Sequence, residues 1–417
     1  MTSTTSFKKN FLAIPLTDII QMIGTLLTIS IFSKIDIKFF ALYIMVLTII
    51  EITNSISLFG NEKFFQKHLK ENNKINKNFI NDSFSLNIVI SASSFVIFLI
   101  YNLIFYSNES FMLSSILFLP ALLNFRTFLI LVYRYNKNNI PILKIKTLVV
   151  CLGLLFKYLA LLFKIDIFYL CLIVFFEQAL EAFLLIYFSN EEKNYLPNKL
   201  VLNINKLFNL IKILFPIGFS IIMFTFLVRI EIILINQLIS PILASGFFVC
   251  VKIFNSMLIF PRSIVSYEFP KLVKSKNENL LKNLYYFYKL ILLTAIIGSI
   301  STYVFGYIYL SFFIGTDLIF AKEYLIFFSM AFFLQCIAGI RNSFLILINR
   351  HNDIFLPQFL SFLGKIFFSF IFIKNFGVLG ACYSFVLIEF LNMSIFNIFM
   401  PSTRKLLKMQ IFSLKKI

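Results

Sequence analysis

Long apolar segments alternate with short polar ones along the whole chain. Each apolar segment has about the length that an α-helix needs to cross the roughly 30 Å hydrocarbon core of a bilayer. The pattern predicts twelve transmembrane helices, numbered here as spans 1 to 12, at residues 11–33, 39–60, 82–104, 111–133, 147–164, 167–188, 211–235, 242–264, 285–312, 323–349, 354–374 and 378–400. Spans 5 and 6 could alternatively form one re-entrant unit.

Polar residues recur at helical spacing inside several spans, so they share one face of each helix. A polar face cannot point into lipid, because the bilayer core offers it no hydrogen-bond partner. We therefore expect spans 1, 2, 7 and 8 to line an internal cavity. The polar faces consist of Asp18, Gln21, Thr25 and Thr28 in span 1, Thr48, Glu51, Asn54 and Ser55 in span 2, and Lys252, Asn255 and Arg262 in span 8.

The second half of the chain repeats the first. The segment "RTFLILVYRYN" in span 4 matches "RNSFLILINRHN" in span 10, and the likeness continues downstream. Six spans per half is an even number, so both halves enter the membrane in the same direction. The repeat predicts two six-helix lobes, residues 1–200 and 201–417, related by a parallel pseudo-two-fold axis. The matched pairs are Arg126 with Arg341, Arg134 with Arg350, Lys157 with Lys365 and Glu177 with Glu389.

Composition supports an integral membrane protein. The 417-residue chain is 59% hydrophobic and only 14% charged, with a mean hydropathy of +0.90. Its net charge of +19 could suggest nucleic acid, but most loop Lys and Arg residues fall in alternate loops. That placement follows the positive-inside rule, so we predict cytoplasmic termini and no nucleic-acid partner. The basic excess would face anionic membrane lipids.

Basic residues also lie inside the predicted spans, where each costs about 2.5–3.5 kcal/mol at a helix centre. Such residues are retained only where they face protein, water or ligand. Arg is frequent among them although Lys dominates the chain, and its planar fork binds phosphate with two hydrogen bonds. Arg262 lies near a span end and could instead reach the interface by snorkelling. The candidates for a cationic, oxyanion-binding cavity are Arg126, Lys157, Arg229, Lys252, Arg262, Arg341 and Lys365.

Acidic residues share the spans, and two interpretations of them stay open. They could pair with the bases as buried ion pairs, or one of them could bind a proton or sodium ion that drives transport. Glu181 is included only in the first interpretation. No residue spacing indicates a metal site or a cofactor. The candidates for ion coupling are Asp18, Glu51, Glu177, Glu231 and Glu389.

Residues 215–273, "FPIGFSIIMFTFLVRIEIILINQLISPILASGFFVCVKIFNSMLIFPRSIVSYEFPKLV", resemble spans 7 and 8 of bacterial polysaccharide transporters. These are the Wzx-type O-antigen flippases of the multidrug/oligosaccharidyl-lipid/polysaccharide (MOP) exporter superfamily. The resemblance rests on Pro216, Gly218, Glu231, Lys252 and a small-residue turn at 244–246. The segment "KNFGVLGACYSFVL" near span 12 is similar to the same family.

The resemblance implies an all-α, MATE-like fold and a flippase that works by alternating access. Its substrate would be an oligosaccharide on undecaprenyl pyrophosphate, such as an O-antigen or capsule repeat unit. The unit would move from the inner to the outer leaflet of the bacterial cytoplasmic membrane, for export of lipopolysaccharide or another polysaccharide. A polysaccharide polymerase and a chain-length regulator would be partners, and a proton or sodium ion would supply coupling.

Two alternatives remain. A cation-coupled drug exporter of the same superfamily would share the architecture but is expected to have an acid-dominated cavity. A many-span polysaccharide polymerase or ligase is the alternative enzyme. Such enzymes resemble proteins with a large outer loop, whereas the predicted outer loops here are short, and the sequence has no Ser/His/Asp, metal or phosphate-loop motif. We therefore predict a transporter that is not an enzyme.

The charge pattern generates a topology prediction. Reporter fusions after residues 70, 140, 200, 280 and 410 should all report a cytoplasmic location, because the basic loops are retained inside. A periplasmic signal from the fusion after residue 200 would contradict the two-lobe arrangement.

Overall fold

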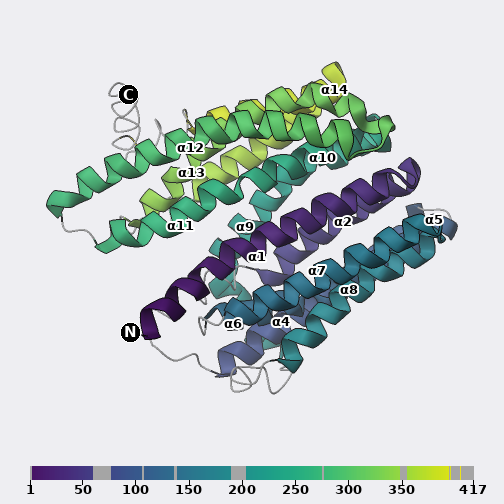
Figure 1. The fold of residues 1–417 in the computed structure, drawn as a ribbon, viewed down its shortest axis with the longest axis horizontal. Coiled ribbons are helices and arrows are strands. Elements are labelled where there is room, and N and C mark those ends of the chain that lie inside the picture. The colour runs from purple at the N-terminus through teal and green to yellow at the C-terminus, as the bar shows by residue number, and fades with distance from the viewer. Residues whose placement is uncertain are drawn as a thin grey trace. The chain divides into compact units, whose positions relative to one another are not determined.

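The computed structural model describes residues 2–59, 77–105, 108–135, 139–188, 203–274, 277–347 and 355–393, together with 395 and 404. All regular elements in these ranges are helices (Figure 1). The chain divides into two compact units, Met1–Phe226 (unit 1) and Leu227–Ile417 (unit 2). The lobe boundary predicted at residue 200 lies outside the described residues, and the boundary between the units falls inside one helix, α9.

In its described residues, unit 1 contains seven complete α-helices, one 3-10 helix and the first part of α9. Within it α1 packs along α7, and α7 packs along α8. Apolar side chains of α6, α7 and α8 form one core cluster, in which the Tyr133 hydroxyl donates to the Leu185 carbonyl at 2.8 Å. The elements are α1 (Thr2–Ser33), α2 (Ile37–Leu58), α4 (Lys77–Phe105), α5 (Asn108–Phe118), η1 (Leu119–Leu123), α6 (Phe125–Tyr135), α7 (Asn139–Leu162), α8 (Ile167–Tyr187) and α9 (Ile204–Leu238).

Unit 2 contains the rest of α9 and the remaining helices. In it α12 packs against α13 and α13 against α14. The buried rings of Phe254, Phe328 and Phe385 lie 5.1–6.0 Å apart by their centroids and form an aromatic core. The elements are α10 (Pro241–Met257), α11 (Ile259–Lys274), α12 (Asn277–Phe312), η3 (Thr316–Tyr324), α13 (Leu325–Leu347) and α14 (Phe355–Met393).

The predicted fold class is confirmed. Ten helical stretches among the described residues are long and apolar enough to cross a membrane. One of them, in α14, covers most of predicted spans 11 and 12, which meet at Gly377 with a φ of 63°. Because only glycine adopts this conformation at no steric cost, Gly377 allows the chain to turn between two helices. The predicted tenth span corresponds to α13. With the two spans in α14 counted separately, the described helices correspond to all twelve predicted spans.

Three local details differ from the sequence pattern or decide between its alternatives. Spans 5 and 6 are the separate helices α7 and α8, not one re-entrant unit. Span 4 is divided into α5, η1 and α6, because Pro120 interrupts the regular helix. The prediction of a turn at residues 244–246 is wrong, because these residues lie in α10. That helix begins after Ser240, whose side chain accepts a hydrogen bond from the Ile242 amide.

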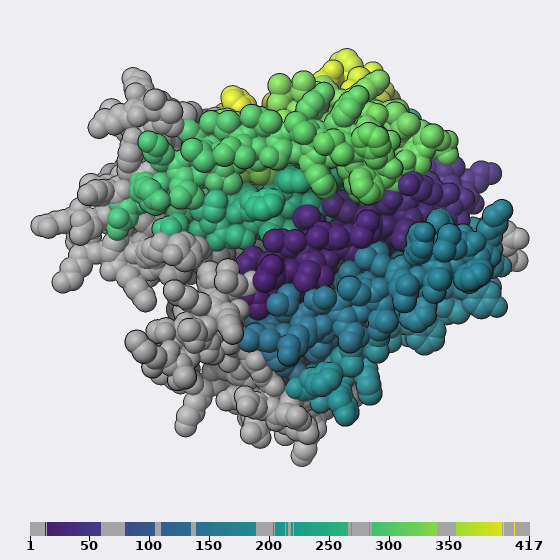
Figure 2. All heavy atoms as spheres, in the orientation of Figure 1, coloured from purple at the N-terminus to yellow at the C-terminus, as the bar shows by residue number. Residues whose placement is uncertain are grey.

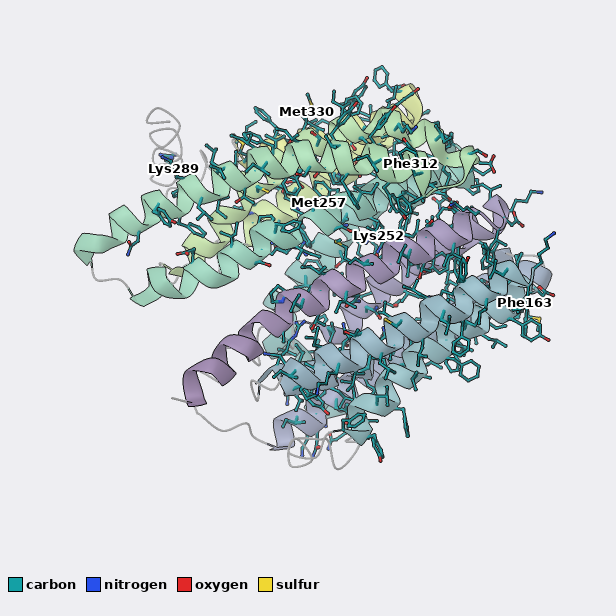
Figure 3. The ribbon with its side chains drawn as sticks, in the orientation of Figure 1. Phe163, Lys252, Met257, Lys289, Phe312 and Met330 are labelled. Carbon is teal, nitrogen blue, oxygen red and sulfur yellow. The ribbon has the colours of Figure 1, made fainter. Side chains whose placement is uncertain are left out.

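Large apolar side chains cover the outside of both units. Phe163 and Phe312, at the ends of α7 and α12, are 73% and 75% exposed (Figure 3). Leu103 and Ile97 on α4 are exposed to a similar degree. The space-filling view shows the atoms of α1, α7 and α12 at the surface (Figure 2), where exposed apolar side chains include Ile23, Leu155 and Ile297. Surfaces this apolar are stable in lipid and not in water, so the chain is a multi-pass membrane protein.

Candidate functional site

Lys157 and Glu177 form an ion pair between α7 and α8 in unit 1. The Lys157 Nζ lies 2.6 Å from Glu177 Oε2 and donates to the Thr28 hydroxyl of α1 at 3.1 Å. Gly153, one turn before Lys157, leaves the space that the Glu177 carboxylate fills. A Cβ atom at residue 153 would lie 1.4 Å from Glu177 Oε1. Three helices therefore meet at one buried ammonium group.

A second polar layer joins α6 and α7 to α8. The Arg126 Nε lies 3.4 Å from Glu181 Oε2, and another guanidinium nitrogen donates to the Gln178 side chain. Lys146 lies 3.9 Å from the other oxygen of Glu181 and donates to Gln21 of α1 at 2.5 Å. Arg126, predicted as part of a cationic cavity, is thus compensated by an acid of its own unit.

The predicted polar face of α1 is turned toward α6 and α7. Asp18 lies 3.6 Å from Arg134, at the end of α6. Gln21 accepts from Lys146, and Thr28 accepts from Lys157. The regular spacing of these α1 residues therefore matches a row of bases within unit 1.

Unit 2 has its own buried pair, between α9 and α14. The Lys365 Nζ lies 2.7 Å from Glu231 Oε1, and both side chains are at most 1% exposed. The same oxygen accepts hydrogen bonds from the hydroxyls of Ser384 and Ser369. The Lys365 ammonium also lies 4.0 Å from the centre of the Phe385 ring, which adds a cation–π contact.

The two lysines are equivalent in the sequence repeat, but their acidic partners are not. Lys157 pairs with Glu177, whose repeat equivalent is Glu389. Lys365 instead pairs with Glu231, which comes from the first helix of the second half. Glu389 is buried in α14, with 8% of its surface exposed. The repeat thus keeps the position of the base and changes the source of the acid.

Arg229 and Lys252 gather around one buried aromatic ring in unit 2. The Arg229 guanidinium carbon lies 5.7 Å from the centre of the Phe248 ring, and the Lys252 ammonium lies 5.1 Å from it. Lys252 projects from α10 in the stick view (Figure 3). Arg262 is exposed on α11. The side chain of Arg341 lies outside the described residues, although its backbone belongs to α13.

Glu51, the remaining coupling candidate, is partly buried on α2. This helix is joined to α4 by a hydrogen bond from the Asn87 amide to the Ser57 carbonyl at 3.3 Å. Asn87 is completely buried, so the bond adds a polar contact inside an apolar interface. Glu51 lies on a different helix from the members of the Lys157–Glu177 and Lys365–Glu231 pairs.

Sequence reasoning missed several residues that build these networks. Lys146 lies just outside predicted span 5, which begins at residue 147, but α7 begins at Asn139 and includes it. Its spacing from Lys157, eleven residues or about three turns, could have indicated a shared face. Gly153 and the serines at 369 and 384 carried no signal, because their roles depend on partners in other helices.

No group of His, Cys, Asp or Glu side chains in the described part of the chain is arranged to hold a metal ion. The cysteines are all free thiols, four of them buried.

Comparison with known proteins relates the chain to transporters by fold. No protein-family model matches, and no curated protein matches in sequence. An inward-facing multidrug resistance MATE family transporter of the MOP superfamily has a TM-score of 0.68. It is 12% identical, over 97% of this chain and 99% of that one. The chain has the fold of a MATE transporter.

Two further structures agree. An outward-facing MATE family transporter of the MOP superfamily has a TM-score of 0.63 at 10% identity, covering 97% of this chain and 96% of that one. A MOP superfamily transporter from Pyrococcus furiosus, described as having a binding pocket of reverse polarity, has a TM-score of 0.63. It is 10% identical and covers 97% of both chains. Identities this low establish the MATE fold and leave the substrate open.

Removing Lys365 alone should destabilise the protein strongly. Lys365→Met leaves the Glu231 carboxylate buried without a counter-charge, at an expected cost of about 3–5 kcal/mol. The double variant Lys365→Met/Glu231→Leu removes both charges and should recover most of that loss. Thermal unfolding of the purified protein measures both, with the exposed Lys374→Met as control. Equal stability of the single and double variants would show that the pair does not compensate a charge.

Adding one carbon at Gly153 should disturb the unit 1 pair. In Gly153→Ala the new Cβ occupies the place of the Glu177 carboxylate, so we expect a loss of about 1–3 kcal/mol in unfolding free energy. Gly339→Ala is the matched control, since a Cβ there would meet no atom within 4 Å. That variant should be neutral or more stable by about 0.5–1 kcal/mol. If both variants unfold alike, Gly153 does not hold the space for Glu177.

Proposed function

We propose that the chain is a transporter that works by alternating access and flips a lipid-linked oligosaccharide carried on undecaprenyl pyrophosphate. The MATE fold supports the transporter class, and the substrate follows from the basic groups of unit 2. The proposed location is the bacterial cytoplasmic membrane with both termini in the cytoplasm, and the product would be an O-antigen or capsule unit in the outer leaflet.

The pair of cations at Phe248 is the observation that carries the proposal. Arg229 of α9 and Lys252 of α10 both contact one buried ring, which brings two bases together inside unit 2. A phosphate group bound there would accept charge-assisted hydrogen bonds from both. Arg262 and Arg341 remain proposed members of the same cationic cavity.

The other predicted bases support the proposal less directly. Arg126, Lys157 and Lys365 have acidic partners, so at these positions the protein itself supplies the negative charge. They would serve substrate binding only when a pair opens. Among the candidate coupling acids, Glu177 and Glu231 pair with lysines and Asp18 with Arg134. The proposed sites for a coupling proton or sodium ion remain Asp18, Glu51, Glu177, Glu231 and Glu389.

The membrane potential would favour this direction of transport. An inside-negative potential assists outward movement of an anion by about 2.3 kcal/mol per charge for each 100 mV. The pyrophosphate head group would move through the protein while the prenyl chain stays in the bilayer. No enzymatic step and no cofactor is required.

Binding of undecaprenyl pyrophosphate to the purified protein tests the proposal. Undecaprenyl pyrophosphate should raise the thermal unfolding temperature of the protein more than undecaprenol does, because undecaprenol lacks the anionic group. Arg229→Ala and Lys252→Ala should each weaken binding by about 1.5–3 kcal/mol, or roughly tenfold to a hundredfold in Kd. Lys374→Ala, which removes an exposed base of the same unit, is the control.

A cation-coupled drug exporter of the same fold predicts the opposite preference. A cationic dye such as ethidium would then stabilise the protein, undecaprenyl pyrophosphate would not, and the Arg229 and Lys252 variants would bind the dye at least as well. That result would contradict the flippase proposal and favour the exporter.

A further inference from the structure

The two lysine–glutamate pairs differ in how completely their carboxylates are enclosed. Glu231 Oε1 receives Lys365 and two serine hydroxyls, and neither Glu231 nor Lys365 is more than 1% exposed. Ser369 and Ser384 are also completely buried and lie 2.9 Å apart through their hydroxyl oxygens. A proton could reach this carboxylate only if the surrounding helices separate.

Glu177 is held more loosely. Its Oε2 accepts from Lys157, while its Oε1 lies over the backbone of Gly153. The Glu177 side chain is 18% exposed, against 0% for Glu231. Because Gly153 has no side chain, the Glu177 carboxylate occupies the space beside its backbone and accepts a hydrogen bond from Lys157.

A row of charged groups extends from Glu177 to side chains that are well exposed. Lys146, Glu181 and Arg126 form the next layer, with side chains 12–14% exposed. Beyond them Arg134 and Asp18 are 31% and 45% exposed. This row, here called the access row, follows the polar face of α1 and ends at the last turn of α6. In unit 2, by contrast, both members of the pair are sealed.

The charged groups around Glu177 come from several helices. Lys157 and Lys146 project from α7, Arg126 from α6 and Glu181 from α8 itself. From α2, Tyr43 and Glu51 lie within electrostatic range of the same region. The described side chains of α5 and η1 carry no charge. Among these groups the bases outnumber the acids.

We infer that Glu177 is the carboxylate that exchanges a proton with water, through the access row, and that the Lys365–Glu231 pair is a permanent tie between α9 and α14. The exchange adds one proton from water to a Glu177 oxygen and turns the carboxylate into a neutral carboxylic acid. Lys157 keeps its charge and its hydrogen bond to Thr28, so the pair changes from neutral to singly positive. This assigns the proton-exchanging role to one of the five candidate acids.

Labelling with carbodiimides tests the inference on the wild-type protein. Dicyclohexylcarbodiimide enters from lipid and adds to protonated carboxyl groups, and a water-soluble carbodiimide approaches from water. Peptide mass spectrometry then locates each adduct. As the pH is lowered, we expect an adduct at Glu177 with both reagents and none at Glu231. With the water-soluble reagent, Asp18 should be modified first, then Glu181, then Glu177.

Three variants complete the test. Glu177→Gln should abolish that adduct, and Glu389→Gln should leave it unchanged. Lys365→Met should make Glu231 reactive, which shows that the reagent reaches buried acids once the tie is broken. Equal labelling of Glu177 and Glu231 in the wild type overturns the inference, and so does the absence of a Glu177 adduct under any condition.

The inference rests on the proposed function only where it treats the exchanged proton as the coupling ion. Labelling is carried out in detergent without any lipid substrate, so it does not depend on Arg229 or Lys252 binding pyrophosphate. A failed lipid-binding experiment with normal Glu177 labelling would reject the flippase and keep the exchange site. The reverse outcome would reject the exchange site alone.

Discussion

Compensation of charge inside an apolar protein is the constraint on which the rest of this structure depends. A buried ammonium or guanidinium group without a partner costs several kcal/mol, which is a large fraction of the stability of a folded chain. The chain meets this constraint by bringing acids from other helices to its bases. Lys157 joins α7 to α8 and α1, and Lys365 joins α14 to α9. The same contacts that remove the energetic penalty thus define which helices are neighbours.

The bases of the two units have different kinds of partner. In unit 1 the bases Arg126, Lys146 and Lys157 all have acidic partners from α8. In unit 2, Lys365 takes its acidic partner from α9, and Arg229 and Lys252 both lie near the Phe248 ring, whose quadrupole attracts cations. A sequence repeat with bases at matching positions has therefore acquired a different set of partners in each unit.

The helices and their polar faces could be predicted from the sequence, because each depends on residues close together in the chain. The twelve spans and the α1 face with Asp18, Gln21 and Thr28 follow from length and 3.6-residue spacing. The pairing could not be predicted, since it depends on the rotation of each helix about its axis. The repeat matched Glu177 with Glu389, yet Lys365 pairs with Glu231. Likewise, Gly153 matters only because the Glu177 carboxylate lies against it.

The change of acid between the repeats alters the polar contact between the equivalent lysine and the first helix of each half. In both units that helix offers an oxygen to the equivalent lysine. It is the Thr28 hydroxyl at 3.1 Å in α1 and the Glu231 carboxylate at 2.7 Å in α9. A hydrogen bond between an ammonium and a neutral hydroxyl is weaker than one reinforced by opposite charges.

Thr28 is therefore a neutral acceptor where α1 meets Lys157 of α7, whereas Glu231 joins α9 to α14 through an ion pair and two serine hydroxyls. The contacts of α1 through Gln21 and Asp18 are more exposed, and solvent screening weakens them. At the position of the equivalent lysines, the polar contact of α1 is thus the weaker of the two, and it lies beside the Glu177 carboxylate.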